Sequence, residues 1–381
     1  MSIDFFEGFE TVGTELGLVN QATTRPRIAL RWDETSAGGI PSSDSFFLID
    51  DFVSEGYAIQ MGSNNFSSGN KLGMNIPAAK HEAPGASART WILGARVHIP
   101  ITSVSNWNIF LVQGLFGGSS ITSVIGLQAQ NGTDLVCLRA DPGAFTIATA
   151  ASVLTPGAWH YVEFKFKIAE SADGGFVQVY LDGSEVIANT AADTNNALTT
   201  AFSEWQMENV GNPTTASGNY VGYDDIYLVD TSVSPHTDFL TPVRVRSLPP
   251  NSDVLNAWDS SPSGGTNYER VDENGADASD LVETDVDGVR DRYGITNLAD
   301  SEAALAVKME AEVINQTGGS PSIHLEIRSG TSTDTSEHVI TSTTAYEVIT
   351  LYADNDPAGG AWTNTAVDAV QAGYLFKNNV V

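Results

Sequence analysis

WHYVEFKFKI, residues 159–168, is the stretch that decides the fold of this chain. Apolar Val162, Phe164 and Phe166 alternate in it with polar side chains such as Glu163. Successive side chains of a β-strand point to opposite faces, so a period of two is typical of a half-buried strand. We predict that Phe164 and Phe166 enter a core while Glu163 lies on the polar face, where Glu163→Ala should cost well under about 1 kcal/mol.

A hairpin is predicted directly after this strand. The segment FVQVYL, residues 176–181, alternates again, and Asp182-Gly183 separates it from apolar Val186-Ile187. A type I′ turn requires positive φ at both central residues, which an Asp-Gly pair tolerates. The three segments therefore predict antiparallel strands joined by short turns.

Earlier segments repeat this pattern of short apolar strands between turn residues. They are residues 91–99, 109–112, 121–127 and 135–138, and residues 219–229 are expected to form the closing strand. Hardly any segment shows a helical period, so the pattern indicates an antiparallel sandwich. The predicted fold class is all-β.

The length of 381 residues suits two domains better than one. Four prolines between residues 232 and 250 favour a boundary there. We predict a first β-sandwich over residues 1–231, a linker over 232–250 with one short strand at 243–246, and a smaller C-terminal β domain over 251–381. The expected elements of that domain are strands at 304–313, 323–327, 339–340 and 346–351, and a short helix at 365–371.

The charge of the chain restricts its partners. It carries 47 acidic against 18 basic residues, a formal net charge of −29. Such a surface repels phosphate backbones, so no nucleic acid is expected as a partner. No stretch approaches the twenty apolar residues of a membrane helix, and no membrane span is expected.

Catalytic signatures were sought in the sequence. It has no phosphate loop, no dinucleotide fingerprint and no nucleophile elbow. The histidines are scattered, and strand alternation explains His98 and His160 as surface or edge residues. A sandwich glycosidase needs two carboxylates on one strand face, as in Glu-x-Asp-x-Glu. The nearest acidic run in an expected strand is Asp224-Asp225, whose adjacent side chains should point to opposite faces. We therefore predict no catalytic residues, no cofactor-binding residues and no enzyme.

No cofactor is expected. The alternative is a bound Ca²⁺, for which the carboxylates of Asp224 and Asp225 are the candidate ligands, because hard cations bind clustered carboxylates. The acidic stretch at 272–291 lacks the ligand spacing of a calcium loop and favours a solvated loop. The tryptophans show no regular grouping, which favours packing over sugar stacking.

The order of the motifs resembles a known group of proteins. Residues 159–164, 175–183 and 223–227 are similar to the concanavalin/laminin-G-like jelly-roll superfamily. With the opening IDFFEGF at 3–9 and the segment FLTPVRVRSLPP at 239–250, the chain resembles a version found in tailed-bacteriophage virion proteins.

This resemblance implies a concanavalin-like jelly-roll sandwich followed by a smaller β-sandwich-like domain. It implies a structural component of a tailed-phage virion, in a tail, fibre or baseplate appendage, for which contact with the host surface is one role. A capsid decoration protein on the head surface is one alternative, a carbohydrate-binding module is another, and a glycoside hydrolase is a third. Expected partners are other virion proteins, further copies of the chain in a homo-oligomer, and a host-surface glycan; the expected location is the virion.

Overall fold

A computed structural model describes most of the chain. The described residues are 3–7, 34–35, 46–50, 57–61, 70–75, 89–100, 106–116, 120–139, 145–169, 174–194, 202–209, 221–272, 280–298, 303–316 and 319–378. The chain divides into two compact units, an N-terminal unit, Ser2–Val245, and a C-terminal unit, Arg246–Val381. The division falls within residues 232–250, the segment predicted to join two domains.

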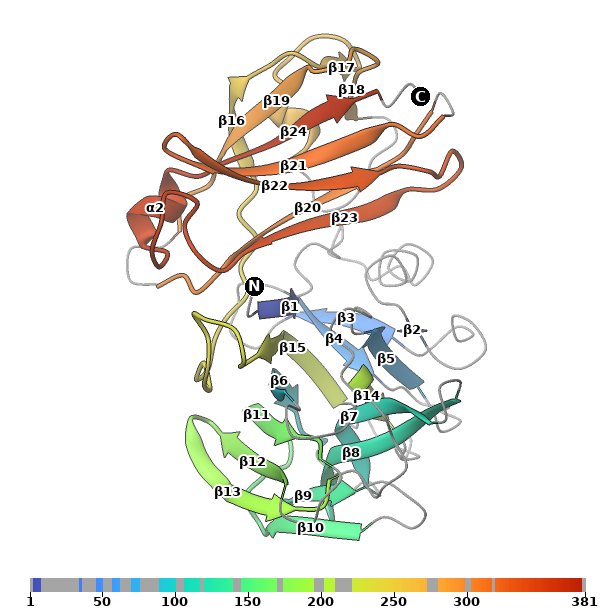
Figure 1. The fold of residues 1–381 in the computed structure, drawn as a ribbon, viewed down its shortest axis with the longest axis vertical. Coiled ribbons are helices and arrows are strands. Elements are labelled where there is room, and N and C mark those ends of the chain that lie inside the picture. Colours follow the sequence, from blue (N-terminus) through green and yellow to red (C-terminus); the bar gives the residue numbers. More distant parts are fainter. Residues whose placement is uncertain are drawn as a thin grey trace. The chain divides into compact units, whose positions relative to one another are not determined.

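The described part of the N-terminal unit consists of two antiparallel sheets (Figure 1). Its strands are β1 (Ile3–Glu7), β2 (Glu34–Thr35), β3 (Phe46–Asp50), β4 (Tyr57–Met61), β5 (Asn70–Asn75), β6 (Thr90–His98), β7 (Trp107–Phe116), β8 (Ser120–Gln130), β9 (Asp134–Arg139), β10 (Phe145–Ala150), β11 (Trp159–Lys167), β12 (Gly175–Leu181), β13 (Ser184–Ala192), β14 (Phe202–Asn209) and β15 (Val221–Asp230). The eight-stranded sheet has the order β13-β12-β11-β6-β15-β4-β3, with β1 also paired to β15. The seven-stranded sheet has the order β10-β9-β8-β7-β14-β5-β2. This arrangement confirms the predicted β-sandwich of the jelly-roll type.

One hydrophobic core is built from both sheets of this unit. Phe164 and Phe166 of β11 are fully buried in it, and their rings stack with centroids 5.1 Å apart. Trp107 of β7 and Trp205 of β14 enter the same core from the other sheet. The predicted burial of Phe164 and Phe166 is confirmed.

The predicted hairpin turn is present between β12 and β13. Asp182 and Gly183 have φ of 51° and 78°, the positive values that a type I′ turn requires. The Asp182 carboxylate also accepts hydrogen bonds from the Tyr161 backbone N–H (2.8 Å) and from Nδ1 of His160 (2.7 Å). Nε2 of His160 accepts from the Thr155 N–H at 2.9 Å. His160 is thus a buried side chain that fixes the turn, and its prediction as a surface residue is wrong.

The prediction for His98 is wrong in the same way. This residue of β6 is buried, and its ring meets the edge of the Trp159 ring at a centroid distance of 5.4 Å. The alternation along β6 places His98 correctly on the polar face, but a large aromatic side chain covers that position.

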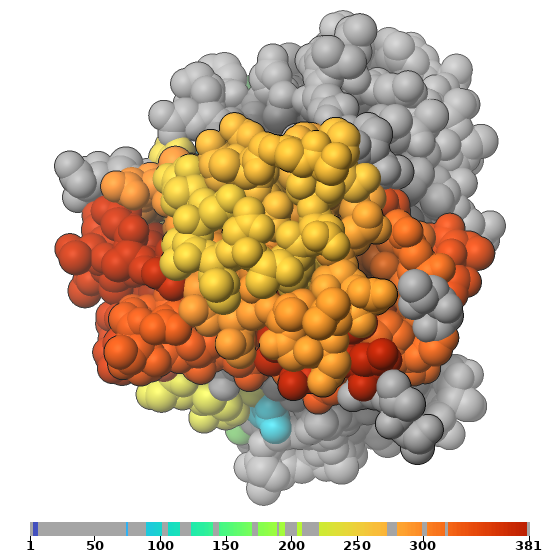
Figure 2. Space-filling view, turned by 90° about the horizontal axis from the view of Figure 1, so that it is seen from above, coloured from blue at the N-terminus to red at the C-terminus, as the bar shows by residue number. Residues whose placement is uncertain are grey.

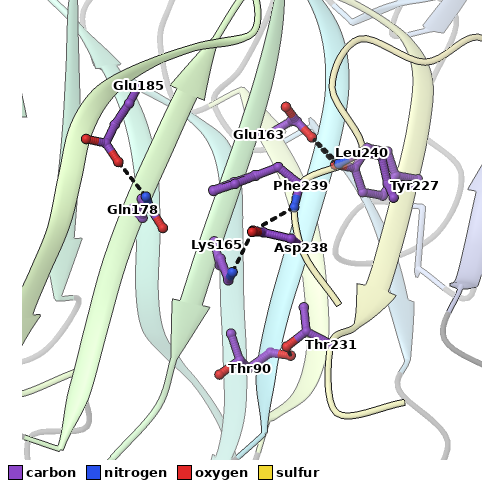
Figure 3. A network of polar contacts seen from close by, with 10 residues as sticks. All are labelled: Thr90, Glu163, Lys165, Gln178, Glu185, Tyr227, Thr231, Asp238, Phe239 and Leu240. Carbon is purple, nitrogen blue, oxygen red and sulfur yellow. Dashed lines mark hydrogen bonds and ion pairs between the residues drawn. The ribbon is translucent and has the colours of Figure 1, made fainter. Parts of the chain in front are cut away.

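The polar face of β11 is covered by residues 236–245, which we call the covering segment. Glu163 lies beneath it and is fully buried, so its prediction as an exposed residue is wrong (Figure 3). The Glu163 carboxylate accepts a short hydrogen bond from the Tyr227 hydroxyl and one of 3.0 Å from the Leu240 N–H. Removing this acceptor leaves two buried donors unpaired. Glu163→Ala should therefore destabilise the N-terminal unit by well over the value of about 1 kcal/mol given as an upper bound from the sequence.

The covering segment is also held by contacts at its first residues (Figure 3). The Phe239 ring packs on Tyr180 at 4.2 Å between centroids, with the Lys165 ammonium 5.3 Å from its centre. Lys165 forms an ion pair of 2.8 Å with Asp238. Residues 236–245 are therefore packed on the eight-stranded sheet and do not form a free linker.

The short strand predicted at 243–246 is absent from this described segment. The Val245 N–H donates to the Asp225 carboxylate at 2.8 Å, so it is not available for pairing with a strand. The alternation of Val243, Arg244, Val245 and Arg246 reflects an extended segment that lies on a sheet.

Glu163 gives the N-terminal unit a pH dependence. Burial raises the pKa of Glu163 above its ordinary value of 4.5, although hydrogen bonds from Tyr227 and Leu240 oppose the shift. The protonated form is favoured on folding, so this contribution is present below about pH 4.5 and is lost as pH rises through the folded-state pKa. The Glu163→Gln side chain keeps an acceptor and never ionises. We expect Glu163→Gln to remove this loss, up to about 1.4 kcal/mol per pH unit for one proton.

This prediction is checked by urea unfolding of the full chain at several values between pH 4 and pH 8. The exposed Glu185, replaced in Glu185→Gln, supplies the matched control and should leave the pH dependence unchanged. If the free energy of unfolding changed with pH by the same amount in wild type and in Glu163→Gln, Glu163 would not be the source of the pH dependence.

The C-terminal unit is a second β structure with its own core. Its elements are β16 (Pro250–Leu255), β17 (Asp259–Ser261), β18 (Leu281–Glu283), β19 (Arg290–Ile295), β20 (Val307–Val313), β21 (Ser322–Ser329), β22 (Ser332–Val339), β23 (Glu347–Ala353), α2 (Asn364–Asp368) and β24 (Gln371–Lys377). Its described strands form a sheet of order β16-β19-β24-β21-β22 and the pairs β17-β18 and β20-β23. Figure 2 shows a face of this unit on which its yellow and orange residues, from its first half, gather at the centre. The strand predicted within 304–313 and the short helix near 365–371 are both present.

Asp291 of β19 is a fully buried carboxylate that fixes the start of this unit. It accepts from the N–H groups of Ala257 (2.5 Å) and Trp258 (2.8 Å), from Nδ2 of Asn267 (2.6 Å) and from the Tyr293 hydroxyl (2.9 Å). One buried side chain therefore joins three chain segments.

Replacing Asp291 by Asn should destabilise the C-terminal unit by about 2 kcal/mol, because an amide N–H₂ would face donors where a carboxylate oxygen accepts. The transition of this unit in urea unfolding, followed by tryptophan fluorescence, measures the change. Asp259→Asn, at an exposed position, is the control. Equal midpoints for the two variants would show that the Asp291 contacts do not stabilise the unit.

Candidate functional site

Strand β14 places a set of polar residues on the face of the seven-stranded sheet that is turned away from the core. Its central sequence is Glu204-Trp205-Gln206-Met207-Glu208. Trp205 and Met207 are fully buried in the hydrophobic core. Because side chains alternate along a strand, positions 204, 206 and 208 share the opposite face.

Strand β7 supplies the neighbours of these positions. The register partners are Gln113 for Glu204, Leu111 for Gln206 and Asn108 for Glu208. The Gln206 side-chain amide donates to Oε1 of Gln113 and to Oε1 of Glu204, each at 2.6 Å. The Gln113 amide in turn lies 3.5 Å from the Ser123 hydroxyl of β8. Three adjacent strands are thus linked by side chains on one face.

A second branch runs from β7 to β8. Nε2 of Gln128 donates to Oδ1 of Asn108 at 2.7 Å, and Nε2 of Gln130 donates to Oε1 of Gln128 at 3.1 Å. Together these side chains form what we call the amide row: Asn108, Gln113, Ser123, Gln128, Gln130, Glu204 and Gln206. The amide row is half-buried at Gln128 and Gln130, and Glu204 and Gln206 are 2% and 1% exposed.

The local sequence explains why these residues share a face. In β8, Ile125, Leu127 and Ala129 enter the core, so Gln128 and Gln130 point away from it. The pairing of β7 with β8 has two register shifts: β7 carries an extra residue between Asn108 and Phe110, and β8 carries one between Ser123 and Ile125. Extra residues at such bulges redirect the side chains that follow. The bulge in β7 brings Asn108 and Gln113 to one face, and the bulge in β8 brings Ser123 and Gln128 to one face.

The chemistry of the amide row suits a ligand that carries many hydroxyl groups. A side-chain amide both donates and accepts hydrogen bonds, and a carboxylate accepts them. A sugar hydroxyl can do both as well, so the half-buried members of the row, Gln113, Ser123, Gln128 and Gln130, can pair with hydroxyls. Functional sites use a few placed polar groups of this kind to orient a ligand.

The amide row was missed in the sequence, although part of its signal is visible there. Glu204-x-Gln206-x-Glu208 places two carboxylate residues on one strand face, with Gln at the position of the expected Asp. Asp224-Asp225 is therefore not the nearest acidic pattern. The amides of β7 and β8 could not be placed beside it, because their register depends on one bulge in β7 and one in β8.

The two predicted metal-ligating residues lie on the other sheet, in β15, and both are buried. Asp225 has φ of 50°, and a register shift with β6 falls between Asp224 and Tyr227. The Asp225 carboxylate pairs with the Arg96 guanidinium at 3.0 Å and accepts from the Val245 N–H. Asp225 therefore holds the covering segment to the sheet.

Metal-binding groups were sought across the part of the chain that the structure describes. No group of three or more His, Cys, Asp or Glu side chains there could hold a metal ion. Among the same residues, no helix has the length and apolar character needed to cross a membrane.

Tryptophans of the described ranges serve packing. Buried examples are Trp91, Trp107, Trp205, Trp258 and Trp362. Trp159 is half-buried, and its ring packs against His98. These residues are part of the cores or packed against other aromatic rings.

The similarity of this chain to known proteins is limited to solved structures. No family model and no curated protein matches the chain. An alginate lyase in complex with an alginate trisaccharide has a TM-score of 0.41 and 14% identity, covering 60% of this chain and 98% of its own. An alginate lyase from Chlorella virus has a TM-score of 0.36 and 11% identity, and the match covers 56% of this chain and 99% of the lyase. A Trypanosoma rangeli sialidase in complex with sialic acid has a TM-score of 0.27 and 14% identity, and the match covers 50% of this chain and 29% of the sialidase.

Two predictions from the sequence are corrected by these matches. They are to alginate lyases and a sialidase, and they contradict the predicted structural role in a tailed-phage virion and the predicted absence of enzymatic function. The carbohydrate-binding alternative agrees better with them. Identities of 11–14% carry no residue role over to this chain, and support at the level of residues comes from the amide row.

Proposed function

We propose that this chain binds a polysaccharide along the amide row of the seven-stranded sheet. The observation that carries the proposal is two hydrogen-bonded groups of polar side chains on one face of β8, β7 and β14, which are half-buried at Gln113, Ser123, Gln128 and Gln130. One group contains Gln128 and Asn108. The other contains Gln113, Gln206 and Glu204.

The geometry supports an extended ligand over a compact one. The amide row spans three neighbouring strands, and strands lie about 4.8 Å apart. Two strand spacings therefore cover roughly 10 Å, which is the length of about two sugar rings. The ladder of the sheet holds each side chain in place, so little conformational entropy is lost when a ligand binds.

A variant in the amide row tests this proposal. Gln206→Ala removes the amide that joins Gln113 to Glu204, and we expect polysaccharide binding to weaken at least about tenfold, or about 1.4 kcal/mol. Affinity electrophoresis against a panel of neutral and acidic polysaccharides measures the loss. Gln128→Ala, at a half-buried position, is expected to act in the same direction.

The matched control is Gln178→Ala, because Gln178 lies on the eight-stranded sheet, where its amide contacts Glu185. It should bind like wild type. Thermal unfolding of each variant shows whether the sheet is intact. Unchanged binding by both Gln206→Ala and Gln128→Ala would contradict the proposal.

Glycoside hydrolysis at the same face is a second candidate, favoured by the shared strand face of Glu204 and Glu208 with Gln206 between them. Cleavage of a glycosidic bond uses two carboxyl groups, one that protonates the leaving oxygen and one that attacks the sugar or activates water. Positions 204 and 208 lie on one strand face by the alternation of β14.

A further inference from the structure

We propose that one face of the five-stranded sheet in the C-terminal unit binds carboxylate groups of an acidic polysaccharide. The site consists of Arg290 and Arg292 of β19 and Glu326 of β21, which we call the arginine cluster. It lies in a different unit from the amide row and does not depend on the function proposed for that row.

The register of β19, β24 and β21, which are neighbours in the sheet, places the arginine cluster on one face (Figure 1). Arg292 pairs with Gly373 of β24, and Gly373 pairs in turn with Glu326. Arg290 lies two residues before Arg292 and therefore points to the same face. The neighbour of Glu326 in β21, Leu325, enters the hydrophobic core. The arginine cluster thus lies on the face of the sheet that is turned away from the core.

The arginine cluster carries an excess of positive charge. Nε of Arg290 donates to Oε1 of Glu326 at 3.0 Å, and Nη2 of Arg292 donates to Oε2 at 2.9 Å. The Glu326 side chain is 3% exposed, so one carboxylate faces two guanidinium groups away from water. Guanidinium groups stay protonated throughout the pH range of proteins. With Glu326 ionised, one positive charge is left over.

Other charged side chains described on this face do not cancel that charge. Three of the five arginines among residues 246–381 lie on it, and the third is Arg328, two positions after Glu326 in β21. The acidic Glu337 belongs to the edge strand β22 and lies 3.7 Å from His324. Three strand spacings, roughly 14 Å, separate β22 from β19. That exceeds the Debye length of about 8 Å at physiological salt, so Glu337 has little effect on Arg290.

Arg290 is the member of the cluster that a ligand can reach, because its side chain is 37% exposed. Within the described residues only Nε of this side chain has a hydrogen-bond acceptor, so both terminal nitrogens remain able to donate. They belong to the planar fork with which arginine binds a carboxylate through two hydrogen bonds. Glu326 fixes the orientation of the guanidinium group before a ligand arrives, which lowers the entropy lost on binding.

Arg292 gives a second indication of an anionic ligand. Its side chain is 11% exposed, and its buried Nε has no hydrogen-bond partner among the described residues. A buried donor without an acceptor is destabilising. The negative charge of a carboxylate bound at Arg290 would offset part of this cost, because charges interact strongly away from water.

The neighbours of the cluster favour a polysaccharide over an acidic peptide. Exposed Thr335 of β22 is the register partner of Glu326. Arg328 lies between Thr333 of β22 and Gln371 of β24. Hydroxyl and amide groups both donate and accept hydrogen bonds, as sugar hydroxyls do. A sheet that binds a peptide selects it instead with pockets for alternate side chains. Positive charge beside hydroxyl-binding groups matches a polymer of uronic acids.

A matched pair of polymers tests the proposal. Polygalacturonate and its fully methyl-esterified form share one backbone, and esterification removes the charge of each carboxylate. The full chain is titrated with oligomers of both by isothermal titration calorimetry at low and at high salt, with poly-glutamate as the acidic peptide. We expect polygalacturonate to bind at least about tenfold more tightly than its ester or poly-glutamate. Its affinity should fall as salt is added.

Arg290→Gln removes the accessible charge, while Glu326 keeps its pair with Arg292. This variant should weaken polygalacturonate binding at least about tenfold. Arg290→Lys, which keeps the charge but not the fork, should lose less. Arg270→Gln is the matched control and should bind like wild type, because the Arg270 guanidinium is held by Asp280 in the same unit. Thermal unfolding shows whether each variant is folded.

Polygalacturonate binding that is lost in Arg290→Gln and retained in Gln206→Ala would support the proposal. The reverse pattern would overturn it and leave the function of the amide row in place. Equal affinity for polygalacturonate and its ester would also overturn it, and poly-glutamate bound as tightly as polygalacturonate would overturn the choice of ligand. If Arg290→Gln does not fold, the ester comparison and the salt dependence of the wild-type chain still decide, since both measure the role of charge.

Discussion

Replacing Phe164 by Ala is expected to destabilise the N-terminal unit by about 3–5 kcal/mol. The Phe164 ring is fully buried and stacks on Phe166. Its removal leaves a cavity in the core to which both sheets contribute, and the paired strands β6 and β12 restrict the collapse that could fill it. A loss of this size is a large part of the stability of an ordinary domain.

Urea unfolding followed by tryptophan fluorescence measures the effect, which should appear in the transition of the N-terminal unit alone. Lys165→Ala is the control on the same strand, since Lys165 lies on the opposite face and forms an ion pair with a largely exposed Asp238. Such a pair contributes about 0–1 kcal/mol. Equal losses in Phe164→Ala and Lys165→Ala would show that the two faces of β11 are wrongly assigned.

The second large effect concerns catalysis at β14. If the amide row also cleaves its ligand, Glu204→Gln and Glu208→Gln should each lower turnover by about 10²–10⁴-fold, the usual contribution of one acid or base. Binding of the polymer should change far less than turnover, because each amide retains a hydrogen-bonding oxygen. Release of reducing ends from the polysaccharides that the chain binds measures the rate.

Glu185→Gln makes the same chemical change at an exposed position and should retain full turnover. Wild-type activity in both Glu204→Gln and Glu208→Gln would remove the hydrolytic candidate. The binding proposal would then stand on Gln206 and Gln128.

The strands of the core could be predicted because their signal is local. Val162, Phe164 and Phe166 have a period of two that needs no knowledge of their partners, and Asp182-Gly183 marks its turn within two residues. Glu163 shows where this reasoning stops. The strand alternation places Glu163 correctly on the polar face of β11. The segment that buries it, however, lies about 77 residues further along the chain, and no local pattern indicates that Leu240 packs there.

The amide row lay beyond prediction for a related reason. Gln206 and Gln113 are 93 residues apart in the sequence, and their contact depends on the pairing of β14 with β7. The faces of the other members depend on one bulge in β7 and one in β8. A bulge changes which residues share a face, and a chain that lacks local Gly or Pro at that point gives little warning of it. The Glu204-x-Gln206-x-Glu208 pattern was visible, since it lies within one strand.

Photo-cross-linking tests most directly whether the seven-stranded sheet binds the ligand. The probe is an oligosaccharide of the tightest-binding polymer that carries a diazirine group, and mass spectrometry of the digested protein locates the adducts. We predict adducts in peptides that contain residues 107–130 and 202–209, the strands of the amide row, and fewer of them in Gln206→Ala. Adducts confined to the C-terminal unit, or equal labelling of wild type and Gln206→Ala, would contradict the proposed site.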